Sequence, residues 1–590
     1  MVSRCLVTTA LEETWPDNKD PVLFLGKWCT KYDRSEQWDQ RDSEMVPYHW
    51  DDRQKISQDY VYLQSVYESF LPKLAEKLND IHGARHGLRY WRIIAGPWLN
   101  CFIQTSFDRF ESLKRAKSLY DITHVNIINA DISHVTAQSM PHFTDLILSD
   151  WGNEYLYGEI VKKSGLFDWT SVQRSTPVPA FNSLQKPAVK RSLKSKIINI
   201  YRAIVSALSS DKKAIIFNSY LSFWDDKKLQ LKLGQIPQIW HTGTLNFFPQ
   251  EKHMRDWDLG PADTDFETLL SALIPGFIPT AYLEGHKQIV RQAHALGWPQ
   301  KAKFIWTSMS HNNDEIFKVW VAEAVEKESK LVIGQHGGLY GVADILTLEE
   351  HEIKISDAYL TWGWTKNNVP KGSQTVPIGQ LKNKRPLGVN HAQQPHGLLI
   401  TCAIPRYSYF LRSMIIAGQW LDYFDDQLAF IGDLPEPIRQ AFLVRLYSDD
   451  YGWGQERRWR DKFDDINLDF GTVPIDQRIA SSRVVVTTYN ATSYLETFTM
   501  DVPTVMFWNP KHWELRQEAI PFFDDLVRVG IMHHSPQSAS EHVSQIWDDV
   551  DQWWSSPDVR QVIKKFSDQY SHLPEDLLNS LKTAFTKIAP

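Results

Sequence analysis

The stretch Lys330-Leu-Val-Ile-Gly-Gln-His-Gly-Gly-Leu-Tyr-Gly341 decides how this chain is expected to fold. It begins as a short apolar run, typical of a buried strand, and ends in glycines that let the backbone approach a ligand closely. Apolar runs at 304–308 and 358–363 flank it, with helical patterns between them. Strands that alternate with helices predict a parallel sheet, so we expect the glycine-rich turn at its carboxyl edge.

A second alternating unit follows a polar, proline-containing stretch at 380–396. Its expected strands, with one expected helix at 493–500, are residues 397–401, 427–431, 484–488 and 503–508. Open parallel sheets bind ligands at the carboxyl ends of their strands, so two such units enclose a ligand between them. The sequence therefore predicts an α/β fold with two Rossmann-like domains facing a cleft. This GT-B-like arrangement carries helical N-terminal elaborations and a C-terminal helical segment.

The expected boundary between the two domains lies in the proline-containing stretch. Residues 1–385 are predicted to form the acceptor-side domain, which holds helical insertions and the His336 motif. Residues 386–590 are predicted to form the nucleotide-binding domain with its terminal helices.

The bulk composition excludes several classes of function. A net charge of -7 over 590 residues argues against a nucleic-acid partner. No stretch approaches about 18 apolar residues and no signal peptide is evident, so we expect a cytoplasmic protein without a transmembrane segment. The basic segment Lys186–Lys196 is either a solvated linker or a peripheral contact with the inner membrane. Two Asp-X-Asp strings, at 256–258 and 263–265, follow no clear strand, so we predict neither a metal site nor a cofactor.

The first candidate site is the turn after the strand at 330–334. The exposed N–H groups of Gln335, Gly337 and Gly338 would suit a phosphate or carboxylate group of a donor. His336 could donate a hydrogen bond to that anion or take part in proton transfer, and Glu352 follows on a predicted helix. The alternative is a tight turn with a structural histidine.

The second candidate site follows the valine-rich strand at 484–488. Tyr489, Asn490, Thr492 and Ser493 open a predicted helix, whose first N–H groups would point at an anion. Glu496 lies one turn further, within reach of a ribose diol. The alternative is a simple capped helix in which Glu496 completes a capping box.

Three single residues are further candidates. Arg406 follows a strand and could bind phosphate or lie on the surface. Asp314 is a candidate nucleophile or base, or merely the N-cap of the helix that starts at Glu315. Glu284 is another candidate catalytic carboxylate.

An N-terminal cluster combines stacking and hydrogen-bonding side chains, as acceptor-sugar sites do. Its members are His49, Asp52, Arg53 and Trp91. The alternative, which explains the whole cluster at once, is a structural corner held by salt bridges.

Several of these segments resemble a family of sugar transferases encoded in bacterial O-antigen gene clusters. The resemblance covers most of the chain and rests on Thr8-Thr-Ala10, Pro47–Arg53, Arg89–Trp98, Asp314–Trp320, Gly334–Gly341, Tyr359–Trp364 and Thr488–Glu496. The Gln-His-Gly-Gly segment is more distantly similar to retaining β-Kdo glycosyltransferases of capsule and O-antigen synthesis. Those enzymes have a GT-B-like fold and use a CMP-activated ulosonic acid.

The resemblance implies a glycosyltransferase of lipopolysaccharide biosynthesis. It would move a sugar from a nucleotide-sugar donor to a glycan or lipid-linked glycan, a surface polysaccharide or O-antigen acceptor. His336 would lie by the donor, Asn490, Thr492, Ser493 and Glu496 would hold the nucleotide, and Asp314 would be the nucleophile of a double displacement. Two alternatives remain open: a non-catalytic glycan-binding or scaffold protein of the same pathway, and a CDP-polyol phosphotransferase.

Overall fold

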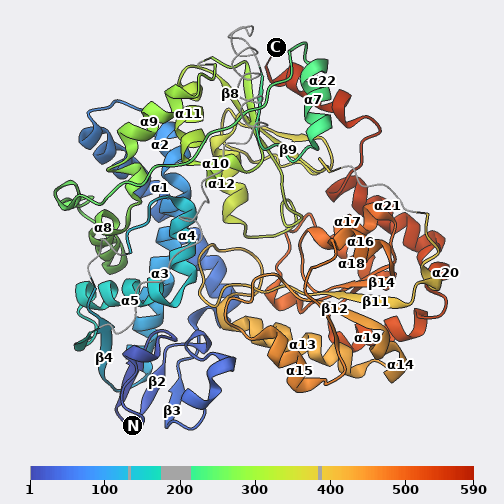
Figure 1. Ribbon diagram of the computed structural model, residues 1–590, viewed down its shortest axis with the longest axis horizontal. Coiled ribbons are helices and arrows are strands. Elements are labelled where there is room, and N and C mark those ends of the chain that lie inside the picture. The colour runs from blue at the N-terminus through green and yellow to red at the C-terminus, as the bar shows by residue number, and fades with distance from the viewer. Residues whose placement is uncertain (1, 131–134, 174–213, 300, 383–387, 590) are drawn as a thin grey trace, which may run out of the picture.

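The computed structural model describes residues 2–130, 135–173, 214–299, 301–382 and 388–589. Within these ranges the strands form three sheets, and neighbouring strands in each sheet run parallel. Figure 1 shows the N-terminal unit in blue and cyan, the middle unit in green and yellow, and the C-terminal unit in orange and red. The predicted parallel α/β fold is confirmed.

The N-terminal sheet has the strand order 3-2-1-4-5, which is the start of a doubly wound sheet. Its strands are β3 (Ser43–Met45), β2 (Val22–Phe24), β1 (Arg4–Val7), β4 (Ile122–Ile128) and β5 (Trp169–Val172). Its helices are α1 (Arg53–His82), α2 (Leu88–Ile94), α3 (Gly96–Leu119), α4 (Met140–Leu148) and α5 (Asp150–Ser164). Helix α1 begins at an Asp52 cap and ends at Gly83, whose φ of 63° is a left-handed conformation that glycine favours.

The middle sheet keeps the chain order of its strands from one edge to the other. These are β6 (Ile215–Ile216), β7 (Phe304–Thr307), β8 (Lys330–Gly334), β9 (Ala358–Thr361) and β10 (Thr375–Pro377). The helices of this unit are α7 (Phe223–Lys232), α8 (Asp265–Phe277), α9 (His286–Ala295), α10 (Ser310–Asn313), α11 (Glu315–Glu326) and α12 (Thr347–Ile355). Because β6, β7 and β8 are neighbours, the loops that follow them meet at one edge of the sheet.

The C-terminal sheet has the complete doubly wound order 3-2-1-4-5-6. Its strands are β13 (Asn467–Asp469), β12 (Phe442–Arg445), β11 (His396–Ile400), β14 (Ser482–Thr487), β15 (Thr504–Phe507) and β16 (Met532–His533). Its helices are α13 (Trp420–Asp433), α14 (Glu436–Ala441), α15 (Gln455–Lys462), α16 (Ile475–Ala480), α17 (Thr492–Met500), α18 (Ile520–Arg528), α19 (Pro536–Ile546), α20 (Val550–Trp554) and α21 (Pro557–Tyr570). Ligands of such sheets bind where the strand order reverses, which here is between β11 and β14.

The last helix, α22 (Leu577–Ile588), leaves the C-terminal unit and packs on the middle unit beside α7 (Figure 1). Its Phe585 ring stacks on Phe304 of β7, with the ring centroids 4.4 Å apart. The chain end therefore ties the middle and C-terminal units together. Within the described ranges, no helix is both long and apolar enough to cross a bilayer.

Three features differ from the sequence-based expectations. The region before residue 385, predicted as one Rossmann-like domain with helical insertions, holds two parallel sheets. Residues 427–431 lie inside α13, because their apolar run continues a helical spacing that starts at Trp420. The sequence of residues 236–244 also predicts a buried strand, but these residues form a loop that contains Pro237, which cannot donate a ladder hydrogen bond. The basic segment Lys186–Lys196 lies outside the described residues.

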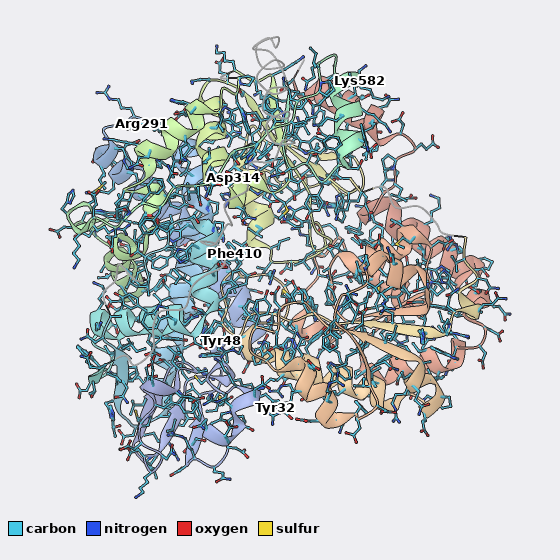
Figure 2. All side chains as sticks on the ribbon, viewed as in Figure 1. Tyr32, Tyr48, Arg291, Asp314, Phe410 and Lys582 are labelled. Atoms are coloured by element: carbon cyan, nitrogen blue, oxygen red, sulfur yellow. The ribbon has the colours of Figure 1, made fainter. Side chains whose placement is uncertain are left out.

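Charged and polar pairs join the N-terminal unit to the C-terminal unit. Arg406 donates both hydrogen bonds of a two-pronged pair to Asp150, each 2.6 Å long. Arg53 donates to the two carboxylate oxygens of Glu514 through two nitrogens, Nε and Nη2, at 2.6 and 2.9 Å. The Tyr32 hydroxyl, labelled in Figure 2 where these two units meet, donates to Asp461 over 2.8 Å. These contacts fix the position of the C-terminal sheet relative to the rest of the molecule.

Glu154 of α5 is buried at the carboxyl end of β1, where it accepts hydrogen bonds from Thr8 and Thr9. Burial raises the pKa of this carboxyl from 4.5 to about 7. The unfolded chain releases this proton near its ordinary pKa, but the folded chain keeps it to a higher pH. Stability is therefore lost as the pH rises between these two values, and the full loss is present above the folded pKa.

Glu154→Gln is expected to remove this pH dependence, because glutamine does not ionise and still accepts from both threonines. The free energy of unfolding at about pH 8 is expected to rise by about 3 kcal/mol, and at about pH 5 to change little. Urea unfolding at the two pH values measures both quantities. An equal gain in the free energy of unfolding at both pH values would contradict the raised pKa of Glu154.

Candidate functional site

A cavity of about 240 Å³ lies between the middle and C-terminal units. We call it the His336 cavity; its lining residues are Tyr220, His336, Trp362, Gln380, Leu381, Lys382, Thr492 and Glu496. His336 follows β8 of the middle sheet, and Thr492 and Glu496 belong to α17 after β14 of the C-terminal sheet. The two sequence motifs that carry the main expectation thus form opposite walls of one cavity.

The two walls touch at Gly338. Its N–H donates to the Thr492 hydroxyl over 3.1 Å. A Cβ at Gly338 would lie 2.5 Å from the Ala491 carbonyl oxygen, so only glycine permits this approach. Nearby, Arg516 of the C-terminal unit pairs with the buried Glu349 of α12, which also accepts the Gly341 N–H. The glycines of the motif thus serve the packing of one unit on the other.

The N-terminus of α17 has no side-chain cap. Its N-cap residue is Ala491, and no side chain accepts a hydrogen bond at that position. The Thr492 hydroxyl contacts Gly338, and the Ser493 hydroxyl contacts the Tyr489 hydroxyl at 2.7 Å. The alternative of a simple capped helix is therefore wrong. A helix start without a side-chain cap favours an anion at its first N–H groups.

The His336 ring is held by a buried network around Glu352. His336 Nε2 lies 3.0 Å from the Tyr340 hydroxyl, which donates to Glu352 over 3.2 Å. Glu352 also accepts from Tyr359 at 3.0 Å and lies 3.1 Å from His311 Nε2. Burial lowers the pKa of His336, although the nearby Glu352 opposes this shift. His336 is therefore neutral at pH 7 and fixed in orientation, so its ring offers hydrogen bonding and no charge to the cavity.

Five of the eight residues that line the His336 cavity were not among the sequence candidates, and Lys382 and Tyr220 are two of them. Lys382 supplies a positive charge and lies 4.9 Å from the centre of the Tyr220 ring. Tyr220 and Asn218, in the loop after β6, both have positive φ, at 70° and 51°. Such backbone strain in a bulky residue is concentrated at functional sites. The sequence does not mark Lys382 as a site residue, because it lies in a polar stretch that resembles a linker.

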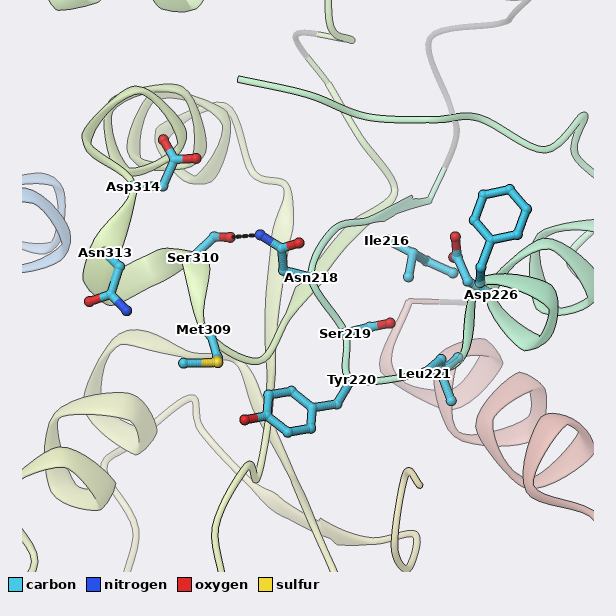
Figure 3. A pocket seen from close by; sticks show the side chains of 11 residues that line it. Ile216, Asn218, Ser219, Tyr220, Leu221, Asp226, Met309, Ser310, Asn313 and Asp314 are labelled. Carbon is cyan, nitrogen blue, oxygen red and sulfur yellow. Dashed lines mark hydrogen bonds between the residues drawn. The ribbon is translucent and has the colours of Figure 1, made fainter. Parts of the chain in front are cut away.

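A second cavity of about 660 Å³ adjoins the first, and Tyr220 lines both. We call it the central cavity (Figure 3); its lining residues are Ile216, Asn218, Ser219, Tyr220, Leu221, Phe223, Asp226, Met309, Ser310, Asn313 and Asp314. The Asn218 amide donates to the Ser310 hydroxyl over 2.7 Å, which joins the loops after β6 and β7. The cavities thus follow the carboxyl ends of three neighbouring strands of the middle sheet.

Asp314 lies on the wall of the central cavity and is also the N-cap of α11. Its Oδ1 accepts the Phe317 N–H over 3.0 Å, and its Oδ2 accepts from the Thr242 hydroxyl. Figure 2 places Asp314 near the junction of the middle unit with the N-terminal helices. The capping alternative is therefore correct, and the same carboxylate also lines a cavity.

Three predicted site residues belong to the scaffold instead. The Gln335 side chain is buried and binds the Trp362 N–H, the Trp364 indole and the Gly337 carbonyl, so it fixes the loop and does not line the cavity. The Arg406 guanidinium group is engaged in the ion pair with Asp150 described above. Glu284 is buried and paired through both oxygens with Arg255, at 2.6 and 2.7 Å. Glu284 is held in this ion pair and lines none of the three cavities described here, so its catalytic role stays a prediction from the sequence.

The N-terminal cluster is a structural corner, as its alternative proposed. His49 is buried against Asp108 at 2.9 Å, and Trp91 is buried and donates to Asn79. Asp52 caps α1, and Arg53 pairs with Glu514. None of these four predicted acceptor residues lines a cavity described here.

Tyr489 and Asn490 lie beside the wall of the His336 cavity that α17 forms. Asn490 is buried and accepts from the Tyr494 hydroxyl at 3.1 Å, and Tyr489 packs against the same helix start. They position α17, while Thr492 and Glu496 line the His336 cavity.

A family of transferases has a sequence model that matches residues 4–585. This chain belongs to the LIC12162 family of transferases. Among curated proteins, no sequence matches this transferase.

Three solved structures show a distant likeness to this transferase. A variant of the wall teichoic acid polymerase TagF with CDPG is 10% identical, over 67% of this chain and 94% of that one, with a TM-score of 0.31. The S. aureus MnaA-UDP structure is 13% identical, over 63% and 95%, with a TM-score of 0.35. MurG of Acinetobacter baumannii is 12% identical, over 52% and 80%, with a TM-score of 0.28.

Proposed function

We propose that this transferase is a glycosyltransferase that uses a nucleotide-activated sugar bound in the His336 cavity. One observation carries the proposal: the turn after β8 and the uncapped start of α17 come from different sheets and meet through Gly338 and Thr492. A cavity between two such sheets, lined by a cation and a helix start, suits a phosphate-containing ligand.

The donor's phosphate is expected against the first N–H groups of α17 and the Lys382 ammonium group. Glu496, one turn into the helix, suits the diol of the ribose, because a carboxylate accepts hydrogen bonds from two neighbouring hydroxyls. His336 contacts the same ligand as a neutral hydrogen-bonding group. A CMP-linked ulosonic acid is the donor that the distant family resemblance favours.

Asp314 is the residue that we assign to proton transfer. Asp314 lines the central cavity but not the His336 cavity. Tyr220, which lines both cavities, therefore lies between Asp314 and the proposed donor. A nucleophile would have to reach the anomeric carbon of the donor, and a base needs only to reach the acceptor. The acceptor oxygen forms its bond to the anomeric carbon, the bond from that carbon to the phosphate oxygen breaks, and the acceptor proton passes to Asp314.

The acceptor and the site of action belong to the same proposal. The acceptor would be a surface polysaccharide or O-antigen glycan, free or lipid-linked, that the protein meets at the cytoplasmic face of the inner membrane. The reaction so written uses no cofactor besides the donor. Within the described ranges, no group of three or more His, Cys, Asp or Glu side chains could hold a metal ion.

Isothermal calorimetry with CMP, UDP, GDP and TDP tests the donor assignment. One of these nucleotides is expected to bind, and Glu496→Gln is expected to weaken its binding about 10- to 100-fold, since a hydrogen bond to a charged group contributes about 1.5–3 kcal/mol. Glu541→Gln, which changes an exposed glutamate of α19 in the same unit, is the matched control and leaves affinity unchanged.

The outcomes separate the proposal from its alternatives. If none of the four nucleotides or their sugar conjugates binds, the donor assignment fails and a scaffold role is favoured. If CDP-polyols are turned over and mass analysis finds phosphorus in the product, the enzyme is a phosphotransferase instead.

A further inference from the structure

A third cavity, of about 450 Å³, extends the central cavity on the side away from His336. We call it the Phe247 cavity; its lining residues are Gln138, Ser139, Pro141, Phe217, Asn218, His241, Thr242, Gly243, Thr244, Leu245, Asn246, Phe247, Asn313, Asp314, Glu315 and Ile316. Asn218, Asn313 and Asp314 line both this cavity and the central one. The three cavities are therefore arranged in series, and Asp314 is placed at the second junction.

The outer wall of the Phe247 cavity is a loop with an exposed aromatic ring. Phe247 is 70% exposed, although a free aromatic face of this size is normally buried. Thr242, Thr244 and Asn246, which carry hydroxyl and amide groups, line the same cavity. An aromatic face beside several polar groups suits a sugar ring, which has one apolar face and a rim of hydroxyls.

The loop that carries Phe247 is anchored at both ends. The Phe248 N–H donates to the Gln138 side chain over 2.9 Å, and the Thr242 hydroxyl donates to Asp314. The inner wall is equally fixed, because buried Glu315 pairs with buried Lys318 at 2.6 Å and accepts the Met140 N–H. Hydrogen bonds and an ion pair thus fix several wall residues of the cavity. Fixed wall residues are needed to orient a bound sugar ring.

We propose that the Phe247 cavity is the acceptor subsite, which binds a pyranoside with its apolar face on Phe247 and a hydroxyl at Asp314. This inference rests on the proposed function, because it takes the His336 cavity as the donor side. It assigns the acceptor to the loop at 241–248 and to α11, far along the sequence from the N-terminal cluster. The hydroxyl at Asp314 is then the one that loses its proton in the transfer.

Saturation-transfer NMR with methyl glycosides of glucose, galactose, mannose, rhamnose and N-acetylglucosamine tests the subsite on the full-length protein. At least one glycoside is expected to give a signal. Phe247→Ala is expected to weaken its binding about two- to tenfold, in keeping with about 0.5–1.5 kcal/mol for a ring contact. Phe247→Tyr keeps the ring and is expected to keep the binding.

Trp224→Ala is the matched control, because Trp224 is an aromatic residue 71% exposed on α7. It is expected to leave the glycoside signal unchanged. If no glycoside binds, or if Phe247→Ala and Trp224→Ala act alike, the subsite is overturned. If a glycoside binds through Phe247 but calorimetry finds no nucleotide, the sugar site stands and the proposed glycosyltransferase function falls.

Discussion

Arg406→Met is expected to lower the free energy of unfolding by about 3–5 kcal/mol, because it leaves the Asp150 carboxylate buried without its main partner. The side chains of both residues are almost fully buried, and Arg406 also donates to backbone carbonyls of Trp28 and Tyr451. Burial alone would raise the pKa of Asp150, but Arg406 and Lys31 together lower it to about 2. The measurement is the urea midpoint of the first unfolding transition, followed by tryptophan fluorescence.

The pH dependence of that loss has a definite sign. A lowered carboxyl pKa contributes stability above the unfolded pKa, which is near 3.8 for this residue type, and the contribution is lost as the pH falls toward 2. The difference between wild type and Arg406→Met is therefore expected to shrink below about pH 4.

Arg460→Met provides the matched control for Arg406. Its partner Glu456 is one helical turn away, and both side chains are about half exposed. A pair of this kind contributes at most about 1 kcal/mol. A loss at Arg406 as small as that at Arg460 would mean that the Asp150 pair does not hold the N-terminal and C-terminal units together.

The two central motifs could be predicted from sequence because each depends on local signals. An apolar run followed by glycine or small hydroxyl residues marks the carboxyl end of a strand, and parallel sheets gather such ends at one edge. His336 and Thr492 could therefore be expected to lie close together. The two motifs touch where Thr492 contacts Gly338, as expected for loops at the carboxyl ends of strands. This contact depends on the absence of a side chain at Gly338.

The same rule failed at Arg406, for a physical reason. This residue also follows a strand, β11, but its side chain meets Asp150 of the N-terminal unit. Nothing near Arg406 in the sequence indicates that α5 packs there. Glu284 is a similar case, because its partner Arg255 ends a short 3-10 helix, Lys252–Arg255, whose sequence has no recognisable pattern.

The separate N-terminal sheet could not be predicted from the spacing of its strands. Between β3 and β4 the chain inserts the long helices α1 and α3, so the regular alternation that marks a Rossmann-like unit is interrupted. The sequence does not indicate a role for Tyr220 or Lys382. Tyr220 stands out by its strained backbone and Lys382 by its neighbours in the folded chain, and neither property leaves a pattern in a single sequence. Their shared cavity appears only once the loops after β6 and β10 are folded together.

Asp314→Asn is expected to reduce sugar transfer about 10²- to 10⁴-fold while leaving the fold and nucleotide binding intact. Asparagine is as good an N-cap as aspartate, so the start of α11 at Glu315 keeps its cap from Asn Oδ1. The amide cannot take the acceptor proton, however, so the loss is expected in the transfer step itself. Nucleotide release from the donor that calorimetry identifies, followed with and without acceptor, measures the loss.

Asp52→Asn separates catalysis from capping in that experiment. Asp52 is also an N-cap aspartate, with its carboxylate on the N–H groups of Gln54 and Lys55. The sequence alone suggested an acceptor role for it, but the structure places it outside the cavities described here. Its substitution is expected to leave transfer unchanged. If Asp314→Asn also leaves the transfer rate unchanged, the base is another residue. If Asp314→Asn removes nucleotide binding as well as transfer, Asp314 belongs to the donor side and acts as the nucleophile of a double displacement.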